Sequence, residues 1–232
     1  MAKVDANGLV SAVSQGHAII QVTADGNPSI TKEFYVYVTK KTEQTKPEPE
    51  KTVIKPVYVE FAKKEIQLTA GAKSKISAKI YPANAENKAV TFVSSNTAVA
   101  TVDASGNITA KAPGSAVITA TAAGDTAVKQ ICTVTVNPKK VSWGKVTRKK
   151  SGAITLKWKK QSGITGYKIY RSEKKKGTYQ LIKTVKGASK VSYTDKKASR
   201  KKTYYYKICS YKKVGAKTYT GALSAVKTVK KK

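Results

Sequence analysis

The amino-acid sequence predicts an all-β chain made of consecutive β-sandwiches. Apolar and polar residues alternate with a period of two in many short runs, which is the pattern of half-buried strands. Gly, Pro and Asn interrupt these runs at short intervals, as expected between antiparallel strands. In addition, residues 2–38 align without gaps with residues 100–136, so part of the chain is an internal repeat. No segment keeps a helical period, which supports the all-β class.

The first copy of the repeat fills residues 2–38. Each copy ends in an alternating strand, at residues 34–38 in the first copy and 132–136 in the second. The recurring residues are Ala2, Val4, Asp5, Gly8, Ala12, Gly16, Ala18, Ile20 and Gly26 in the first copy, and Ala100, Val102, Asp103, Gly106, Ala110, Gly114, Ala116, Ile118 and Gly124 in the second. The two copies are therefore expected to fold alike.

The two copies differ in what precedes them. The second copy has further strands upstream, from about Pro56, and the first copy has none. We therefore expect residues 1–39 to form the C-terminal half of a truncated domain, and the natural protein to extend further toward its N-terminus. Half a sandwich has open sheet edges, so this first domain is expected to be prone to self-association, in a chain otherwise expected to be monomeric.

A linker is expected at residues 40–55. Proline and charged residues alternate there, with Pro47 and Pro49 at its centre, and this composition predicts an extended, semi-rigid spacer. The joint after the second copy, at residues 137–140, is shorter and contains Pro138. A joint of this kind predicts two domains held end to end with limited freedom.

Residues 56–138 are predicted to form a complete antiparallel sandwich or barrel. Their alternation is clear in residues 76–80 and 116–120. The runs at residues 90–106, 112–120 and 132–136 resemble the bacterial immunoglobulin-like group 2 family, although Phe92 stands where that family usually has Trp. The resemblance implies an immunoglobulin-like fold and a stalk or adhesin module of intimin- and invasin-like bacterial surface proteins. It implies no enzymatic residues.

Residues 139–232 are predicted to form a second complete sandwich. The runs at residues 154–158, 163–170 and 203–210 resemble a fibronectin type III domain. In that resemblance Tyr204 occupies the tyrosine corner, where the hydroxyl is bonded back to the backbone. The predicted fold of the whole chain is therefore a tandem of immunoglobulin-like β-sandwiches, arranged as beads on a string.

The charge of the chain is concentrated in this last domain. The whole chain has a formal net charge of +32. Residues 139–232 contain 30 Lys and Arg against two acidic residues, which gives this part a net charge of +28. A charge of this density bears on partners and solubility, and it does not determine the fold.

One set of side chains on the basic domain is a candidate binding surface. By alternation they face solvent, and in the resembled fold their strands are neighbours in one sheet: Lys168, Tyr170, Tyr205 and Lys207. Two interpretations stay open. The four residues form either a solvated strand face with ordinary cross-strand pairing, or a ligand surface for an anionic polymer.

The sequence contains no candidate catalytic or metal site. His17 is the only histidine and is expected in a surface turn, while Cys132 is expected to be buried and Cys209 to point outward. The acidic residues that recur in turns are Asp5, Asp25, Asp103 and Asp125. They either cap these turns or contribute to a calcium site, and isolated carboxylates make calcium the weaker alternative. We expect no enzyme activity, cofactor or metal.

Three functions are compatible with these features. The first is a structural and adhesive part of a secreted bacterial surface protein, whose cationic domain associates with an anionic cell-wall polymer or glycan, or with a host surface ligand. The second is a targeting or accessory region of a secreted carbohydrate-active enzyme or peptidase whose catalytic domain lies upstream. The third is nucleic-acid binding, which is expected to be non-specific because the chain has only three Arg, the residue that dominates base-edge recognition.

The expected location is extracellular or at the bacterial cell surface. The sequence has no apolar run long enough for a membrane span. Met1 is followed by Ala-Lys-Val-Asp without an apolar segment, so any export signal would lie outside this chain.

Overall fold

The structure is a computed structural model that describes residues 1–40 and 52–232. The described residues form strands, turns and loops and contain no helix, which confirms the predicted all-β class. Accordingly, no helix in these two ranges could cross a membrane. The chain divides into two compact units, Met1–Thr52 and Val53–Lys232. The predicted spacer falls largely on residues 41–51, outside the described residues.

The first unit contains two antiparallel pairs of strands. Strand β1 (Ala2–Val4) pairs with β2 (Val10–Ala12), and β3 (Gly16–Ala24) pairs with the longer β4 (Asn27–Val38). Nearly all side chains of its described residues are exposed, and none of these residues is buried. The described part of this unit therefore has no apolar core of its own.

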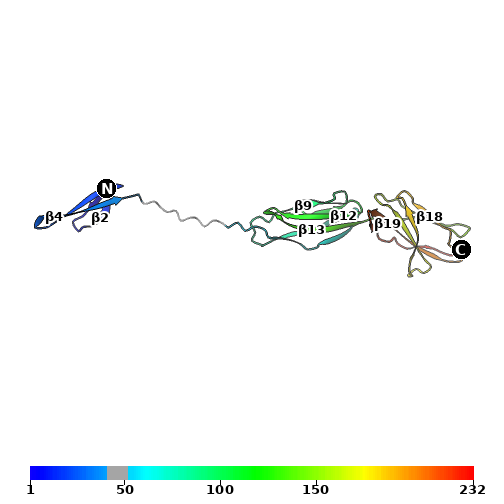
Figure 1. The fold of residues 1–232 in the computed structure, drawn as a ribbon. Coiled ribbons are helices and arrows are strands. Elements are labelled where there is room, and N and C mark those ends of the chain that lie inside the picture. The colour runs from blue at the N-terminus through cyan, green and yellow to red at the C-terminus, as the bar shows by residue number, and fades with distance from the viewer. Residues whose placement is uncertain (41–51) are drawn as a thin grey trace. The chain divides into compact units, whose positions relative to one another are not determined.

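The second unit begins with a sandwich that contains the other copy of the repeat (Figure 1). Its strands are β5 (Tyr58–Phe61), β6 (Glu65–Thr69), β7 (Lys73–Lys75), β8 (Ala78–Tyr81), β9 (Val90–Ser94), β10 (Ala100–Val102), β11 (Asn107–Ala110), β12 (Gly114–Ala122) and β13 (Asp125–Asn137). They form a four-stranded sheet in the order β6-β13-β12-β9, a three-stranded sheet in the order β10-β11-β7, and the pair β5-β8. Strand β6 runs parallel to β13, and the other pairs are antiparallel.

The repeat predicted from the sequence recurs in the structure, strand for strand. Gly16 pairs with Val38 in the first copy as Gly114 pairs with Val136 in the second, and both hairpins have a register irregularity at the same place, after Thr23 and Thr121. The turns are also alike. The carboxylate of Asp5 accepts hydrogen bonds from two backbone N–H groups, and so does that of Asp103. These two Asp residues therefore cap turns, which is one of the two roles that the sequence left open for them.

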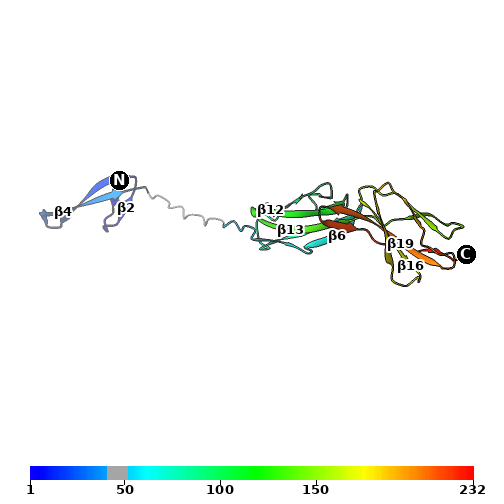
Figure 2. The same ribbon diagram turned by 45° about the vertical axis from the view of Figure 1, so that its right-hand side comes forward.

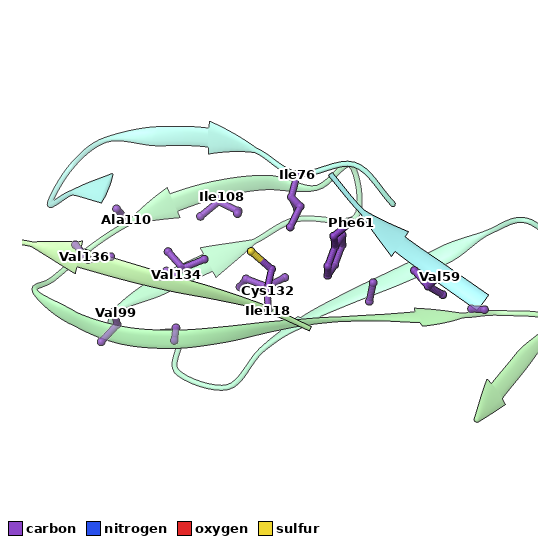
Figure 3. Close-up of a cluster of buried hydrophobic side chains, with 14 of the residues drawn as sticks. Val59, Phe61, Ile76, Val99, Ile108, Ala110, Ile118, Cys132, Val134 and Val136 are labelled. Carbon is purple, nitrogen blue, oxygen red and sulfur yellow. The ribbon is translucent and has the colours of Figure 1, made fainter. Parts of the chain in front are cut away.

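The core of this sandwich lies between its sheets. In β12, every second residue is buried, because successive side chains of a strand point to opposite faces. Figure 3 shows the thiol of Cys132 among apolar side chains that include Phe61, Ile108 and Ile118. Cys132 is fully buried, as predicted, and Phe92 packs against this core with its ring stacked 6.4 Å from that of Phe61.

The C-terminal sandwich follows in the same unit. Its strands are β14 (Trp143–Arg148), β15 (Ile154–Trp158), β16 (Gly166–Ser172), β17 (Gln180–Lys186), β18 (Ser192–Asp195), β19 (Tyr204–Val214), β20 (Lys217–Thr220) and β21 (Lys227–Val229). One sheet has the order β14-β15-β18 and the other β17-β16-β19-β20, with β21 also paired to β19 (Figure 2). The predicted inward residues of 154–158 and 204–208 are buried between the two sheets.

Candidate functional site

The strand register places the four predicted surface residues on one face of the C-terminal sandwich. Strands β16 and β19 are antiparallel neighbours, in which Tyr170 lies opposite Lys207 and Lys168 lies opposite Cys209. Tyr205 lies opposite Ser172, two positions further along the same face. Ile169 and Ile208, which alternate with these residues, are fully buried in the core. Lys168, Tyr170, Tyr205 and Lys207 are half-buried, and we call them the β16–β19 face.

Two further tyrosines lie beside the lysines of the β16–β19 face, and one of them, Tyr211, is buried. The ammonium group of Lys207 lies 4.3 Å from the ring centroid of Tyr179, and that of Lys168 lies 5.6 Å from the ring centroid of Tyr211. Both are cation–π distances. Alternation along β19 could have indicated Tyr211, because it has the same parity as Tyr205. Tyr179 lies in the loop before β17, and only the folded arrangement brings it to Lys207.

Cys209 lies on the expected side of the sheet but is covered by its neighbours. The register does place it on the outer face, but its side chain is only 1% exposed. Burial raises the pKa of its thiol, which also contacts Tyr170. Alternation gives the side of a sheet that a residue faces, but not whether neighbouring side chains cover it. Burial likewise raises the pKa of the Tyr170 hydroxyl.

The positive charge of residues 139–232 is almost uncompensated within the sandwich. Its two acidic side chains are both engaged by cations of the same sandwich. Asp195 forms an ion pair with Arg171 at 2.8 Å, and Glu173 forms one with Lys202 at 3.0 Å. The other basic side chains of this domain therefore have no acidic partner within it. The sandwich exposes a surface of ammonium groups to any anion in solution.

Two of the three arginines have internal roles. The guanidinium of Arg148 donates hydrogen bonds to the carbonyls of Gly152, Ser199 and Lys202 at 2.7–3.1 Å. That of Arg171 lies 4.9 Å from the ring centroid of Tyr204. Neither group is therefore free for bidentate recognition of a phosphate or a base edge, and the outward charge of the domain comes almost entirely from lysine.

Tyr204 has the role predicted for a tyrosine corner. Its hydroxyl accepts a hydrogen bond at 3.2 Å from the backbone N–H of Ser199, five residues upstream. The guanidinium groups of Arg148 and Arg171 lie 6.0 and 4.9 Å from the centroid of the Tyr204 ring. Tyr204 is therefore part of the fold and does not belong to the β16–β19 face.

The remaining candidate residues do not form a site. In residues 1–40 and 52–232, no group of three or more His, Cys, Asp and Glu side chains lies close enough together to hold a metal ion. His17 is exposed in β3 and its ring lies 6.4 Å from that of Tyr37. Cys132 and Cys209 are both free thiols, buried in different sandwiches. The carboxylate of Asp125 accepts the backbone N–H of Ala127 at 2.9 Å, so it caps a turn as well.

The comparisons with known proteins agree with this architecture. Residues 58–134 match the family model of the bacterial Ig-like domain (group 2), which confirms the resemblance for the middle sandwich. Domains of this group occur in bacterial surface or extracellular proteins. Together with the fibronectin type III-like C-terminal sandwich, they are typical of surface proteins or accessory modules of enzymes, and such domains are usually non-catalytic. No curated protein matches the chain.

Three solved structures align with parts of this chain. A Fn3-like protein from Clostridium thermocellum is 25% identical, over 37% of this chain and 83% of that one, with a TM-score of 0.29. A segment of two fibronectin type III domains from chicken tenascin is 15% identical, over 76% of this chain and 99% of that one, with a TM-score of 0.48. A β-1,2-glucanase from Parabacteroides distasonis is 20% identical, over 50% of this chain and 17% of that one, with a TM-score of 0.34.

Proposed function

We propose that this chain is a non-catalytic part of a bacterial surface or secreted protein, and that its C-terminal sandwich binds an anionic cell-wall polymer or glycan. We further propose the domain organisation given above, with half a sandwich at residues 1–39, a spacer at 40–55, an Ig-like stalk module at 56–138 and the cationic module at 139–232. The observation that carries the proposal is the uncompensated charge of the last module, since both of its acidic side chains are internally paired.

The proposed mechanism is multivalent attraction between lysine ammonium groups and the charges of the polymer. Each ammonium group that meets a polymer charge releases a counterion, so affinity falls as salt concentration rises. A phosphate-rich wall polymer provides a regular row of such charges. The β16–β19 face adds the half-buried rings of Tyr170 and Tyr205, with Tyr179 beside Lys207. Sugar rings can pack on these rings while Lys168 and Lys207 meet the charges.

The first experiment measures retention of the chain on isolated bacterial cell walls at different salt concentrations. We expect retention at low salt and a loss of affinity of at least about tenfold between about 50 and about 200 mM salt. Retention that does not change with salt would contradict the proposed mechanism. Cell walls from which the phosphate-containing polymer has been stripped provide the control for the ligand.

The second experiment tests the β16–β19 face against a matched change of charge. The variant Lys168→Gln/Lys207→Gln removes two charges from the face, and Lys149→Gln/Lys150→Gln removes two from the exposed turn that follows β14. A larger loss of retention in the first variant supports a ligand surface. Equal losses would show that this face is a solvated strand surface and that binding depends on net charge alone.

A further inference from the structure

A cleft of about 400 Å³ lies where the two sandwiches of the second unit meet. It is lined by the turn at Ala70–Gly71, the loop at residues 111–113, the connector at 138–139 and the loop at 160–164. This volume is within the range of small-ligand sites, which often lie between domains. The cleft therefore has the size and the position of a binding site.

We call this cleft the junction cleft, and the charged side chains that line it are all positive. Each of the three parts that meet there contributes one lysine: Lys111 comes from the middle sandwich, Lys139 from the connector and Lys160 from the C-terminal sandwich. Among residues 1–40 and 52–232, no acidic side chain lines the cleft. Two other clefts of the same unit contain Glu65 and Glu173, so the absence of an acidic side chain distinguishes the junction cleft from them.

Hydrogen bonds from the C-terminal sandwich hold the connector that forms one wall, and a bond within the middle sandwich holds the end of β13 that leads into it. The side-chain amide of Gln161 donates to the carbonyls of Lys139 and Lys140, both at 3.0 Å, and the hydroxyl of Ser210 donates to the carbonyl of Lys139 at 2.9 Å. On the other side, the backbone N–H of Ala70 donates to the carbonyl of Asn137 at 2.9 Å. The cleft is therefore preformed, and a ligand does not have to order it.

The turn at Gly71 leaves room for the side chain of Lys139. A Cβ atom at Gly71 would lie 3.1 Å from Cε and 3.2 Å from Nζ of Lys139, so this side chain passes directly over the glycine. Gly71 has a φ of +88°, and its N–H donates to the carbonyl of Ala110, next to Lys111 in the chain. The hydrogen bond therefore fixes the backbone next to Lys111, and the turn at Gly71 lies against the side chain of Lys139.

We propose that the junction cleft binds a phosphate group of the anionic polymer, with Lys111, Lys139 and Lys160 as its ligands. This proposal rests on the proposed function and assigns it a defined site. Three lysines line one cleft without an acidic residue among the described residues around it, so an anion in the cleft can be attracted by more than one ammonium group. A phosphate group is the best match because its oxygens are arranged around a tetrahedron and can accept from three donors at once, whereas a carboxylate has two oxygens in one plane.

The site also uses both sandwiches, with a consequence for stability. A ligand that contacts Lys111 and Lys160 bridges the two domains, so it should stabilise the second unit as a whole. Binding to scattered surface lysines would not require both domains. This difference allows the junction cleft to be separated from non-specific attraction.

The test uses the full chain and a short oligomer of glycerol phosphate. Binding is measured by calorimetry at one fixed salt concentration, and the backbone amide signals of Gly71 and Gly163 are followed by NMR. The variant Lys111→Gln/Lys139→Gln/Lys160→Gln is compared with Lys174→Gln/Lys175→Gln/Lys176→Gln, which removes the same charge from the exposed turn after β16. An oligogalacturonate of equal charge provides the carboxylate control.

We expect the junction variant to raise the dissociation constant at least about tenfold more than the turn variant, since charge-assisted hydrogen bonds are lost. The signals of Gly71 and Gly163 should shift with glycerol phosphate and shift less with oligogalacturonate. Equal losses in the two variants, or shifts confined to the β16–β19 face, would overturn the junction site and leave the proposed function intact. If the unmodified chain binds neither oligomer, both proposals fail.

Discussion

Asp195 holds two other side chains in the interior of the C-terminal sandwich. It is 2% exposed, and its Oδ2 atom accepts from Arg171 and from the hydroxyl of Tyr206, both at 2.8 Å. A carboxylate in such a position is stabilised by its partners, and each partner in turn depends on it. The other acidic residue of the domain, Glu173, forms an exposed pair with Lys202. The domain therefore contains one acidic side chain in a largely buried ion pair and one in an exposed ion pair.

The first prediction compares these two acids. Asp195→Ala leaves Arg171 and Tyr206 without their partner and should lower the free energy of unfolding by about 2–4 kcal/mol. This loss is near the lower end of the range for a buried ion pair, because the side chain of Arg171 keeps some contact with water. Glu173→Ala should have no measurable effect. Both are measured by urea unfolding followed by tryptophan fluorescence, since Trp143 and Trp158 both belong to this sandwich. Equal losses in the free energy of unfolding for the two variants would contradict the structural role of Asp195.

The second prediction concerns alkaline pH. Burial, and secondly the hydrogen bond to Asp195, raise the pKa of Tyr206 above its ordinary value. In the unfolded chain a tyrosine ionises near pH 10. The stability that comes from the neutral hydroxyl is therefore fully present below about pH 10 and is lost as the pH rises above it. The free energy of unfolding should fall above this pH, and it should fall less steeply in Tyr206→Phe. Parallel curves for the two proteins would contradict this.

At the level of the elements, the same turn occurs in both copies of the repeat, but the atoms around it differ. Gly8 and Gly106 occupy equivalent positions and have φ values of 80° and 77°, a region that other residues rarely adopt. A Cβ at Gly106 would lie 2.1 Å from the carbonyl oxygen of Ile76, whereas nothing lies within 4 Å of a Cβ at Gly8. The difference arises because the segment around Ile76 packs beside β11, and the described part of the first unit has no counterpart of it.

The third prediction uses this difference. Gly8→Ala introduces backbone strain of about 1–2 kcal/mol. Gly106→Ala introduces the same strain and, in addition, displaces the backbone at Ile76. Amide hydrogen exchange should therefore accelerate markedly across residues 100–110 in Gly106→Ala and only slightly across residues 2–12 in Gly8→Ala. Equal acceleration in both variants would show that strain alone matters at these turns.

The sequence predicted the strands better than their connections. Alternation identified the inward residues of β15 and β19, because the period of two follows directly from strand geometry. Residues 76–80 alternate as well, yet they do not form one strand, since Ile76 and Ser77 lie between β7 and β8, which belong to different sheets. A chain that crosses between sheets keeps its apolar alternation, so the crossing leaves no signal in the pattern.

The candidate site was predictable in part for similar reasons. The sequence placed Lys168, Tyr170, Tyr205 and Lys207 on one outer face, but the opposition of Tyr170 and Lys207 depends on strand register, which alternation does not determine. The junction cleft could not be predicted at all. Lys111, Lys139 and Lys160 come from separate segments, and only the packing of the two sandwiches brings them to one cleft.

At the scale of the whole molecule, charge and apolar surface are separated along the chain. Residues 139–232 contain most of the net charge of +32, whereas the exposed large apolar side chains are numerous in the first unit. Val22 and Phe34 are each 54% exposed, while the equivalent residues of the second copy, Ala120 and Cys132, are fully buried. In that copy β12 and β13 are flanked by β9 and β6, and the described part of the first unit has no such flanking strands.

This separation leads to the fourth prediction, that the chain associates with itself through the first unit. Open edges and an apolar face favour contact between two copies, and residues 1–40 have too little net charge to prevent it. Sedimentation velocity should show a reversible increase in size with protein concentration. Val22→Lys/Phe34→Lys should weaken this association by at least about a hundredfold, since burial of each large side chain contributes about 1.5–3 kcal/mol.

The control for this prediction is Ile19→Lys/Tyr35→Lys, which adds the same charge to the opposite face of the same hairpin. Ile19 and Tyr35 are 53% and 63% exposed, and the equivalent residues of the second copy are Val117 and Thr133, which lie on the outer face of β12 and β13. If the face equivalent to the buried one mediates contact, this control associates much like the unmodified chain. Equal weakening in both variants would instead assign the contact to the strand edges, and a monomer at every concentration would contradict self-association.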